Sequence, residues 1–255
     1  MIDIHCHILP GIDDGAQTIY DSLDMARQAV SQGIDTIIAT PHHMNGRYEN
    51  RKVDILKRVE EFNQLLSDEN IALTILPGQE NRIFGEIIQD YKNGEILTLA
   101  NNSSYVFIEF PSNSVPHYAE QLLYEMQLMG LIPVIVHPER NAELIQHPDR
   151  LYEMVKNGAA TQVTAASLIG DFGKKIKRFS EQLIEANLTH FLASDAHNIK
   201  NRAFKMEEAM EEVTKKYGSD MMYFFTENAE LLIQNQTIYR EVPQPVKQKK
   251  LFGLF

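Results

Sequence analysis

Short runs of apolar, β-favouring residues alternate along the chain with longer amphipathic stretches. Seven runs have the length and composition of buried strands: residues 2–6, 35–40, 71–78, 104–110, 132–137, 160–165 and 189–194. The helical period predicts helices at residues 19–32, 50–67, 83–91, 115–129, 142–156, 174–186, 202–215 and 219–235. Strands that alternate with helices predict an α/β protein with parallel strands and right-handed crossovers.

Several predicted helices end at a glycine shortly before the next strand, as at Gly33, Gly130 and Gly158. Seven strands in this order fit either an open doubly wound sheet or a closed barrel. No change of composition divides residues 1–239, so we expect one domain there. Residues 240–255 contain two prolines, three lysines and an apolar tip, which predicts a flexible tail.

Metal-binding residue types lie at the ends of the predicted strands or in the turns that follow. Residues two apart on a strand point to the same face, so His5 and His7 can share one site. The same spacing joins Asp195 and His197. The full set of candidate ligands is His5, His7, Asp14, His42, Glu80, Glu109, His137, Asp195 and His197.

The spread of these ligands over six of the seven predicted strands favours a closed barrel. The carboxyl ends of parallel strands converge on one point only if they form a ring, and the active sites of α/β barrels lie at that face. An open sheet would instead collect ligands from the strands beside its switch point. We therefore predict a TIM-like (β/α)7 barrel.

Nine imidazole and carboxylate side chains are too many for one ion and suit two or three divalent cations. A set of imidazole and carboxylate ligands without thiolate suits Mn, Fe or Zn. Cations held close together lower the pKa of a bridging water and neutralise an anionic ester. The ligand set therefore points to phosphoester hydrolysis.

Composition narrows the function further. The chain has 255 residues and a formal net charge of -11, and no basic stripe with interleaved aromatic residues appears, so we expect no nucleic-acid partner. Cys6 is the only cysteine, which excludes an intrachain disulfide and favours a reducing compartment. The chain also begins without a secretory pattern and contains no run of apolar residues long enough to span a membrane, so we expect a cytoplasmic protein.

Six motifs together resemble the PHP superfamily, named for polymerase and histidinol phosphatase. They are HCH near the N-terminus, TPHH, PGQE, IEFP, HPERN and SDAHN. Within that superfamily, the opening MIDIHCHILPGIDDGA is similar to the bacterial manganese-dependent tyrosine phosphatases of capsule and exopolysaccharide operons. The resemblance covers residues 1–235 and implies a distorted seven-stranded barrel, a three-metal site and a phosphotyrosine protein substrate, such as a bacterial tyrosine kinase.

The resemblance also implies how the ligands divide among three cations. One cation is expected at His5, His7, Glu80 and Asp195. The second is expected at Glu80, Glu109 and His137, and the third at Asp14, His42 and His197. The tail would bring the protein close to a membrane-bound kinase through weak contact with an acidic membrane surface or a partner, although a terminus without a role is the simpler interpretation.

For catalysis, we expect a hydroxide bridging the metals to attack phosphorus in line. Arg140 and Arg202 follow two ligand strands, and a guanidinium group matches phosphate with two hydrogen bonds, so both are candidates to bind substrate. Each has a plainer alternative, an ion pair for Arg140 and a surface position for Arg202. Asp14 or His42 can pass a proton to the leaving phenolate.

A cysteine-dependent phosphatase does not fit the sequence. Such an enzyme needs an arginine six residues after its thiolate, and the sixth residue after Cys6 is Ile12. By the two-residue period of a strand, Cys6 also faces away from His5 and His7. We therefore predict that Cys6 is a small buried apolar residue.

Some alternatives remain open at the level of sequence. The same ligands would serve a small-molecule phosphatase, such as one for histidinol phosphate, or a non-catalytic metal-binding module. Asp13 lies beside Asp14 in a plain turn motif, so either carboxylate is a candidate for the site. His43 is expected to be a neighbour without a ligand role, and His190 to have a surface or packing role.

Overall fold

The computed structural model describes residues 1–247, so residues 248–255 of the predicted tail lie outside it. The strands are β1 (Ile2–Cys6), β2 (Thr36–Ala39), β3 (His42–His43), β4 (Thr74–Pro77), β5 (Glu80–Arg82), β6 (Tyr105–Glu109), β7 (Ile132–Val136), β8 (Ala160–Thr164) and β9 (Phe191–Ala193). The α-helices are α1 (Ile19–Ser31), α2 (Lys52–Asp68), α3 (Ile87–Lys92), α4 (Ala119–Leu128), α5 (Ala142–Gln146), α6 (Pro148–Lys156), α7 (Ala165–Ile169), α8 (Lys174–Glu185), α9 (Met206–Tyr217) and α10 (Ser219–Ile233). Two short 3₁₀ turns are η1 (Leu99–Asn101) and η2 (Pro138–Arg140).

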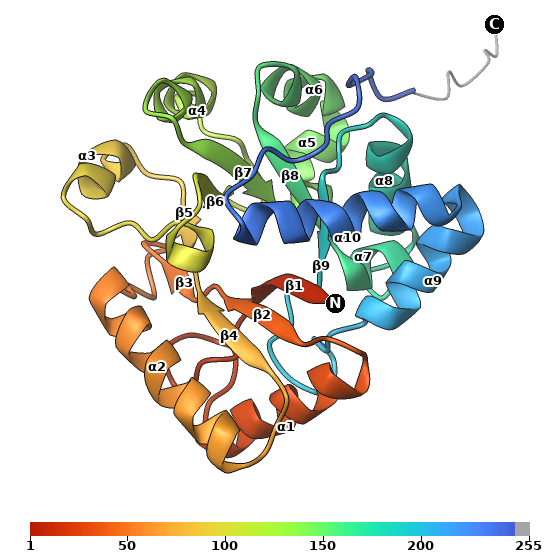
Figure 1. Cartoon of the computed structure of the whole chain (residues 1–255). Coiled ribbons are helices and arrows are strands. Elements are labelled where there is room, and N and C mark those ends of the chain that lie inside the picture. Colours follow the sequence, from red (N-terminus) through yellow and green to blue (C-terminus); the bar gives the residue numbers. More distant parts are fainter. Residues whose placement is uncertain (248–255) are drawn as a thin grey trace, which may run out of the picture.

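All strand pairs are parallel, and the helices surround them (Figure 1). One sheet has the order β1-β2-β4, and the other has the order β3-β5-β6-β7-β8-β9. The predicted parallel α/β class is thus confirmed, but the predicted number of seven strands is wrong, because the described residues form nine strands in two sheets.

The two additional strands, β3 and β5, lie just beyond the ends of the strands predicted at residues 35–40 and 71–78. Pro41 separates β2 from β3, and a proline cannot donate a hydrogen bond to a strand ladder. Gly78 and Gln79 separate β4 from β5. A Cβ atom on Gly78 would lie 2.6 Å from Ile38 Cγ2, so only glycine permits the close approach of these strands.

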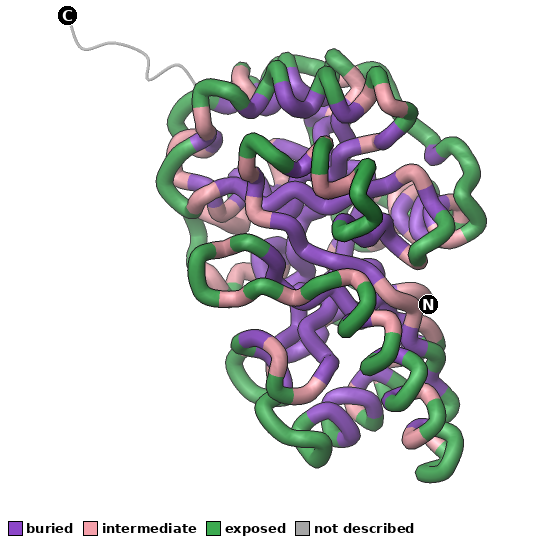
Figure 2. Tube along the Cα trace, turned by 90° about the vertical axis from the view of Figure 1, so that its left-hand side faces the viewer, coloured by how far each residue is buried: buried purple, intermediate pink, exposed green. Residues whose placement is uncertain are grey.

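The buried apolar residues form two clusters on opposite sides of the strands, an inner and an outer layer. Figure 2 shows the buried residues gathered in the interior of the molecule. Alternate residues point to opposite sides, so Phe107 of β6 lies in the inner layer and Ile108 in the outer one. The inner layer also contains Ala229 and Leu232 of α10, which packs against β1 and β9. The outer helices bury their apolar faces on the other layer and leave their polar faces exposed.

Two predicted helices differ in the structure. The single helix predicted at residues 142–156 is divided into α5 and α6, because Pro148 begins a new helix and cannot continue the preceding one. The short helix α7, which directly follows β8, has too few residues for a detectable period. None of the helices in residues 1–247 combines the length and the apolar character that crossing a membrane requires.

The first part of the predicted tail packs against the body of the protein. Arg240 Nη1 donates hydrogen bonds to Gly158 O at 3.0 Å and to Ala159 O at 3.2 Å. The Gln244 amide donates to Ala186 O at 2.8 Å, and Val246 is buried. Residues 240–247 therefore belong to the folded body, contrary to the predicted boundary.

Candidate metal centre

The nine candidate ligands form one connected cluster at the carboxyl ends of the strands. Each of them has a donor atom within 3.8 Å of a donor atom of another. Asp14 lies in the turn after β1, and His197 follows β9, so the cluster joins the two ends of the fold. The convergence predicted from sequence is therefore present.

The first group consists of His5, His7, Glu80 and Asp195, all buried. The Nε2 atoms of the two histidines are 3.3 Å apart. They lie 3.3–3.6 Å from Glu80 Oε2 and 3.4–3.5 Å from Asp195 Oδ1. Ligands about 2.0–2.2 Å from one cation are roughly 3.0–3.6 Å from one another, so His5, His7 and Glu80 have the spacing of ligands to one ion, and Asp195 lies at similar distances from both histidines.

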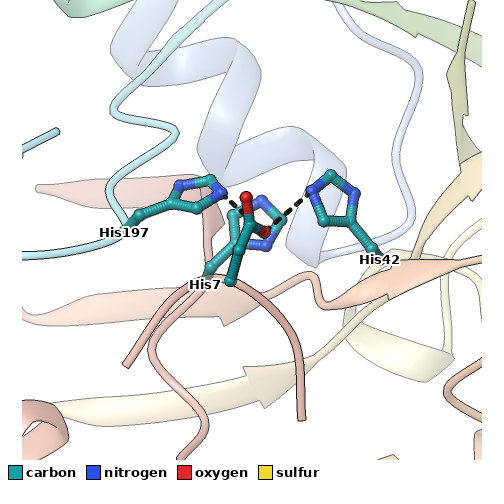
Figure 3. Close-up of side chains that lie close together, drawn as sticks. His7, His42 and His197 are labelled. Carbon is teal, nitrogen blue, oxygen red and sulfur yellow. Dashed lines mark ion pairs between the residues drawn. The ribbon is translucent and has the colours of Figure 1, made fainter. Parts of the chain in front are cut away.

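A second group is centred on Asp14. Its Oδ1 atom lies 3.3 Å from His42 Nε2 and 3.4 Å from His197 Nε2. Figure 3 shows the rings of His7, His42 and His197 directed toward one another. Since donor atoms of all four residues lie within 4.8 Å of one another, they can surround one ion.

The remaining group, which contains Glu80, Glu109 and His137, leaves less space for an ion between its donor atoms. His137 Nε2 is 2.8 Å from Glu80 Oε1, a direct hydrogen-bond distance. Glu109 Oε2 is 3.8 Å from His42 Nδ1, and His42 Nδ1 is 2.8 Å from Glu80 Oε2. Glu80 therefore contacts the other groups through both of its oxygens and is the hub of the cluster.

Several donor atoms of the cluster are buried without a hydrogen bond of good geometry, although Glu80 Oε2 lies 2.8 Å from His42 Nδ1 and Glu109 Oε2 lies 3.0 Å from Arg82 Nε. Among the described residues these are Glu80 Oε2, Glu109 Oε2, His42 Nδ1 and His197 Nε2. Buried polar atoms are normally satisfied, and unpaired ones are costly. Divalent cations would satisfy all four, so the residues present fit a metal centre.

Outer hydrogen bonds orient three of the imidazole rings. His5 Nδ1 lies 2.9 Å from Gln162 Oε1, and His7 Nδ1 lies 2.7 Å from Asp13 Oδ2. His197 Nδ1 lies 2.9 Å from the carbonyl oxygen of Asp195. In each case Nδ1–H donates to an oxygen, which leaves the Nε2 lone pair directed into the cluster.

The structure distinguishes the two aspartates of the turn. Asp14 faces the cluster, whereas Asp13 is buried behind His7. A Cβ atom on Gly15 would lie 2.0 Å from the carbonyl oxygen of His7, so glycine is required where this turn folds back onto the ligand strand. The predicted ligand of the pair, Asp14, is the one in the cluster.

The surroundings of Glu80, Glu109 and His137 shift the pKa values of these ligands in different directions. Burial opposes ionisation of Glu80, but His42 and His5 hold its pKa well below the usual value. Burial and the neighbouring Glu80 carboxylate raise the pKa of Glu109 to about 7. Burial and Arg140 lower the pKa of His137 to about 4, so this imidazole is neutral at pH 7 and suited to ligation.

Two ligands have strained backbones. His137 has φ 36° and Asp195 has φ 52°, in the left-handed region that residues other than glycine seldom adopt. This strain is retained at the two positions where β7 and β9 turn their ligands toward the cluster, which is typical of a functional site.

Three arginines lie beside the cluster. Arg140 Nη2 is 2.6 Å from Asp195 Oδ2, and Arg202 is 3.2 Å from the same oxygen and 3.5 Å from Asp14. Both line a cavity of about 300 Å³ together with Asp14, His42, Glu109, Phe110, Ser112, Val136, His137, Pro138, Asn141 and Asp195. Arg82, which contacts Glu109, was not predicted as part of the site.

Sequence reasoning missed the outer partners of the rings as well. Gln162 lies on β8, the strand that was expected to provide no ligand. An amide side chain within the fully buried strand ATQVT was the available signal. Asp13 was considered only as a rival of Asp14, because its sequence position does not reveal that it contacts His7.

Other residues agree with their predicted roles. Cys6 is buried and unpaired, and burial raises the pKa of its thiol well above the usual value, so it is not a nucleophile. His43 is buried with its ring edge-on to Phe84 and does not belong to the cluster. His190 is buried and accepts a hydrogen bond from the Thr161 amide, which is a packing role.

Comparison with known proteins adds independent evidence. Residues 1–234 match the family described as capsular polysaccharide synthesis, CpsB/CapC. The chain is 56% identical, over the full length of both chains, to the tyrosine-protein phosphatase YwqE of Bacillus subtilis. It is 30% identical to the tyrosine-protein phosphatase CpsB of Streptococcus agalactiae serotype III, over 93% of this chain and all of the relative.

A solved structure is also closely similar. It comes from work on YwqE of Bacillus subtilis and CpsB of Streptococcus pneumoniae, described as unique metal-dependent tyrosine phosphatases. It superposes with a TM-score of 0.95 at 56% identity, covering 97% of this chain and all of the other. The fold described above is thus shared, over nearly the whole chain, with a protein described as a metal-dependent tyrosine phosphatase.

Proposed function

We propose that this chain, which belongs to the CpsB/CapC family of capsular polysaccharide synthesis proteins, is a metal-dependent protein-tyrosine phosphatase. One observation supports this most directly. Nine imidazole and carboxylate ligands converge beside a cavity that is also lined by Arg140 and Arg202. A cluster that binds cations next to two guanidinium groups suits a phosphate ester.

We assign the ligands to three cations. The first is held by His5, His7, Glu80 and Asp195. The second is held by Glu80, Glu109 and His137, and the third by Asp14, His42 and His197. Imidazole and carboxylate donors without sulfur favour Mn²⁺, with Fe or Zn as alternatives.

When bound, the cations would supply Lewis-acid activation of water and of the phosphoryl group. The protein side chains do the rest. Arg140 and Arg202 bind the phosphoryl oxygens from the cavity wall, after releasing part of their contact with Asp195. Asp14 and His42, which also line the cavity, are the candidates to relay a proton from solvent water to the leaving phenolate.

We propose further that the two sheets form one distorted barrel of seven passes. β2 continues into β3 and β4 into β5 along the chain, so the nine strands make seven passes. The Asp195 amide donates to His5 O and the His7 amide to Ala196 O, both at 2.9 Å, which joins the last pass to the first. The inner apolar layer includes residues from every pass, as a filled barrel interior would.

The substrate we propose is phosphotyrosine on a protein, such as a bacterial tyrosine kinase of polysaccharide synthesis, in the cytoplasm. A small-molecule phosphatase with the same metals is the second candidate, since ligand chemistry alone does not distinguish the two. Phe110 in the cavity wall can pack against the ring of phosphotyrosine, and the close relatives described as tyrosine-protein phosphatases favour this substrate.

The test compares Mn²⁺-dependent hydrolysis of a phosphotyrosine peptide with that of histidinol phosphate. We expect a clear preference, in kcat/KM, for the peptide, and loss of activity after chelation. The variant His137→Ala should be inactive while retaining the circular dichroism spectrum of the wild type. Preference for histidinol phosphate would support the small-molecule candidate, and an active metal-free protein would contradict the mechanism.

A further inference from the structure

Arg82 is a cationic residue built into the candidate metal centre. It is the last residue of β5 and the register partner of Glu109 on β6. Its Nη2 donates to Glu109 Oε1 at 3.1 Å, and its Nε lies 3.0 Å from Glu109 Oε2. The guanidinium group thus lies along a carboxylate that we assign to the second cation.

The contact is largely shielded from water. The side chain of Glu109 is 10% exposed and that of Arg82 is 23% exposed. Because solvent screens this pair little, Arg82 favours the ionised form of Glu109 and opposes the effects of burial and of Glu80. A cation arriving beside Glu109 would meet the positive charge of Arg82 at short range.

The three groups of ligands differ in how ready they are to bind a cation. The donors around His7 and those around Asp14 are 3.3–3.6 Å apart and leave space for an ion between them. In the second group, His137 bonds directly to Glu80 and Glu109 is paired with Arg82. Ligation there has to replace existing interactions.

We propose that Arg82 is an internal counter-ion of the second cation position. Because of it, the cation held by Glu80, Glu109 and His137 is the weakest bound of the centre and exchanges with solvent. Activity then responds to the free Mn²⁺ concentration through this one position. The inference rests on the metal centre of the proposed function and goes beyond it.

Two variants separate charge from geometry. Arg82→Gln removes the positive charge, so the weakest Mn²⁺ should bind at least about tenfold more tightly. Arg82→Lys retains the charge without the planar guanidinium, so its affinity should stay within about threefold of the wild type. Arg27→Gln is the matched control, because Arg27 pairs with Asp24 and Glu69 on an exposed surface and its loss changes net charge equally.

Binding is measured by titrating chelator-treated protein with Mn²⁺ and following free Mn²⁺ by electron paramagnetic resonance. Circular dichroism verifies that each variant is folded. A weakest dissociation constant that falls for Arg82→Gln, but not for Arg82→Lys or Arg27→Gln, supports the counter-ion role. If Arg82 only holds Glu109 in place, both Arg82 variants will bind the weakest ion less tightly.

The result also separates this inference from the proposed function. Unchanged or weaker binding in Arg82→Gln, with Mn²⁺ bound normally by the wild type, overturns the counter-ion role alone. A wild-type protein that binds no Mn²⁺ would overturn the proposed metal centre and the inference together.

Discussion

Asp13 accepts a hydrogen bond from the imidazole of His7, with 2.7 Å between Oδ2 and Nδ1. The same carboxylate also accepts from the backbone amides of Gly15 and His42, at 2.9 and 3.2 Å. One buried aspartate therefore connects the turn after β1, a ligand ring and the start of β3. Although it points away from the cluster, it sets the position of two proposed ligands.

The variant Asp13→Asn should lower metal affinity. An amide keeps the shape of the carboxylate but loses its charge and one acceptor, so His7 Nδ1–H loses the anionic partner that fixes the ring orientation and makes Nε2 a stronger ligand. We expect Mn²⁺ affinity to fall about 10–100-fold. Metal content after gel filtration measures the effect, and Asp24→Asn on exposed α1 is the control. Full metal retention would show that the contact with Asp13 is dispensable.

Gly15→Ala should destabilise the protein severely. The new Cβ would meet backbone atoms of His7 at 2.0–2.9 Å, and a backbone cannot move aside cheaply. We expect a loss of more than about 3 kcal/mol in the free energy of unfolding, or no soluble protein. Gly85→Ala introduces a methyl group into open space and should change stability by less than about 1 kcal/mol. Urea unfolding compares the two, and equal stability would contradict the steric argument.

Arg140→Lys should reduce catalytic efficiency. A lysine retains the charge but cannot hold a phosphoryl group with two parallel hydrogen bonds, so we expect kcat/KM to fall about 10–100-fold. Arg150→Lys, in a partly exposed ion-pair network with Glu143 and Glu120, should have nearly wild-type activity. Mn²⁺ content is measured in parallel, because Arg140 also contacts Asp195. Unchanged kcat/KM would leave Arg140 with an ion-pair role only.

His190 predicts a pH dependence of stability that is independent of metal. Burial and Arg240 lower its pKa from 6.5 to about 3 in the folded protein. As pH falls below 6.5, the unfolded chain takes up a proton that the folded chain refuses, so stability decreases between these values. The loss from this residue is about 1.4 kcal/mol per pH unit.

The measurement uses chelator-treated protein, so that metal release does not contribute. His190→Asn keeps an acceptor for the Thr161 amide but does not titrate. Urea unfolding at pH 6 and pH 4.5 should show a shallower decrease for the variant than for the wild type. Parallel curves would mean that His190 is not the group responsible.

The ligand-type residues at the strand ends and the two-residue period of the strands could be predicted from the sequence, because both depend on residues that are close together along the chain. Phe107 and Ile108 alternate between the two apolar layers as their neighbours along the strand require. The ligands His5 and His197 could be brought together only by assuming that the strand ends converge. That assumption succeeded because parallel strands with helical crossovers place all carboxyl ends on one side.

Features that depend on contacts between distant residues were not predictable. The residues next to Arg82 in the sequence do not indicate that it contacts Glu109. Those next to Gln162 do not indicate that it contacts His5. β3 has two residues and β5 three, too few to display a period. The polar composition of residues 240–247 suggested a flexible tail, yet backbone carbonyls of the body bind Arg240 and Gln244.

Backbone hydrogen bonds join β1 to the residues after β9, and this pairing has a consequence for synthesis on the ribosome. His5 and His7 emerge first, but their partner Asp195 emerges only when most of the chain has been made. A nascent or truncated polypeptide that lacks Asp195 therefore has only three of the four donors proposed for the first cation. We expect that cation to reach its full affinity only after most of the chain has been made.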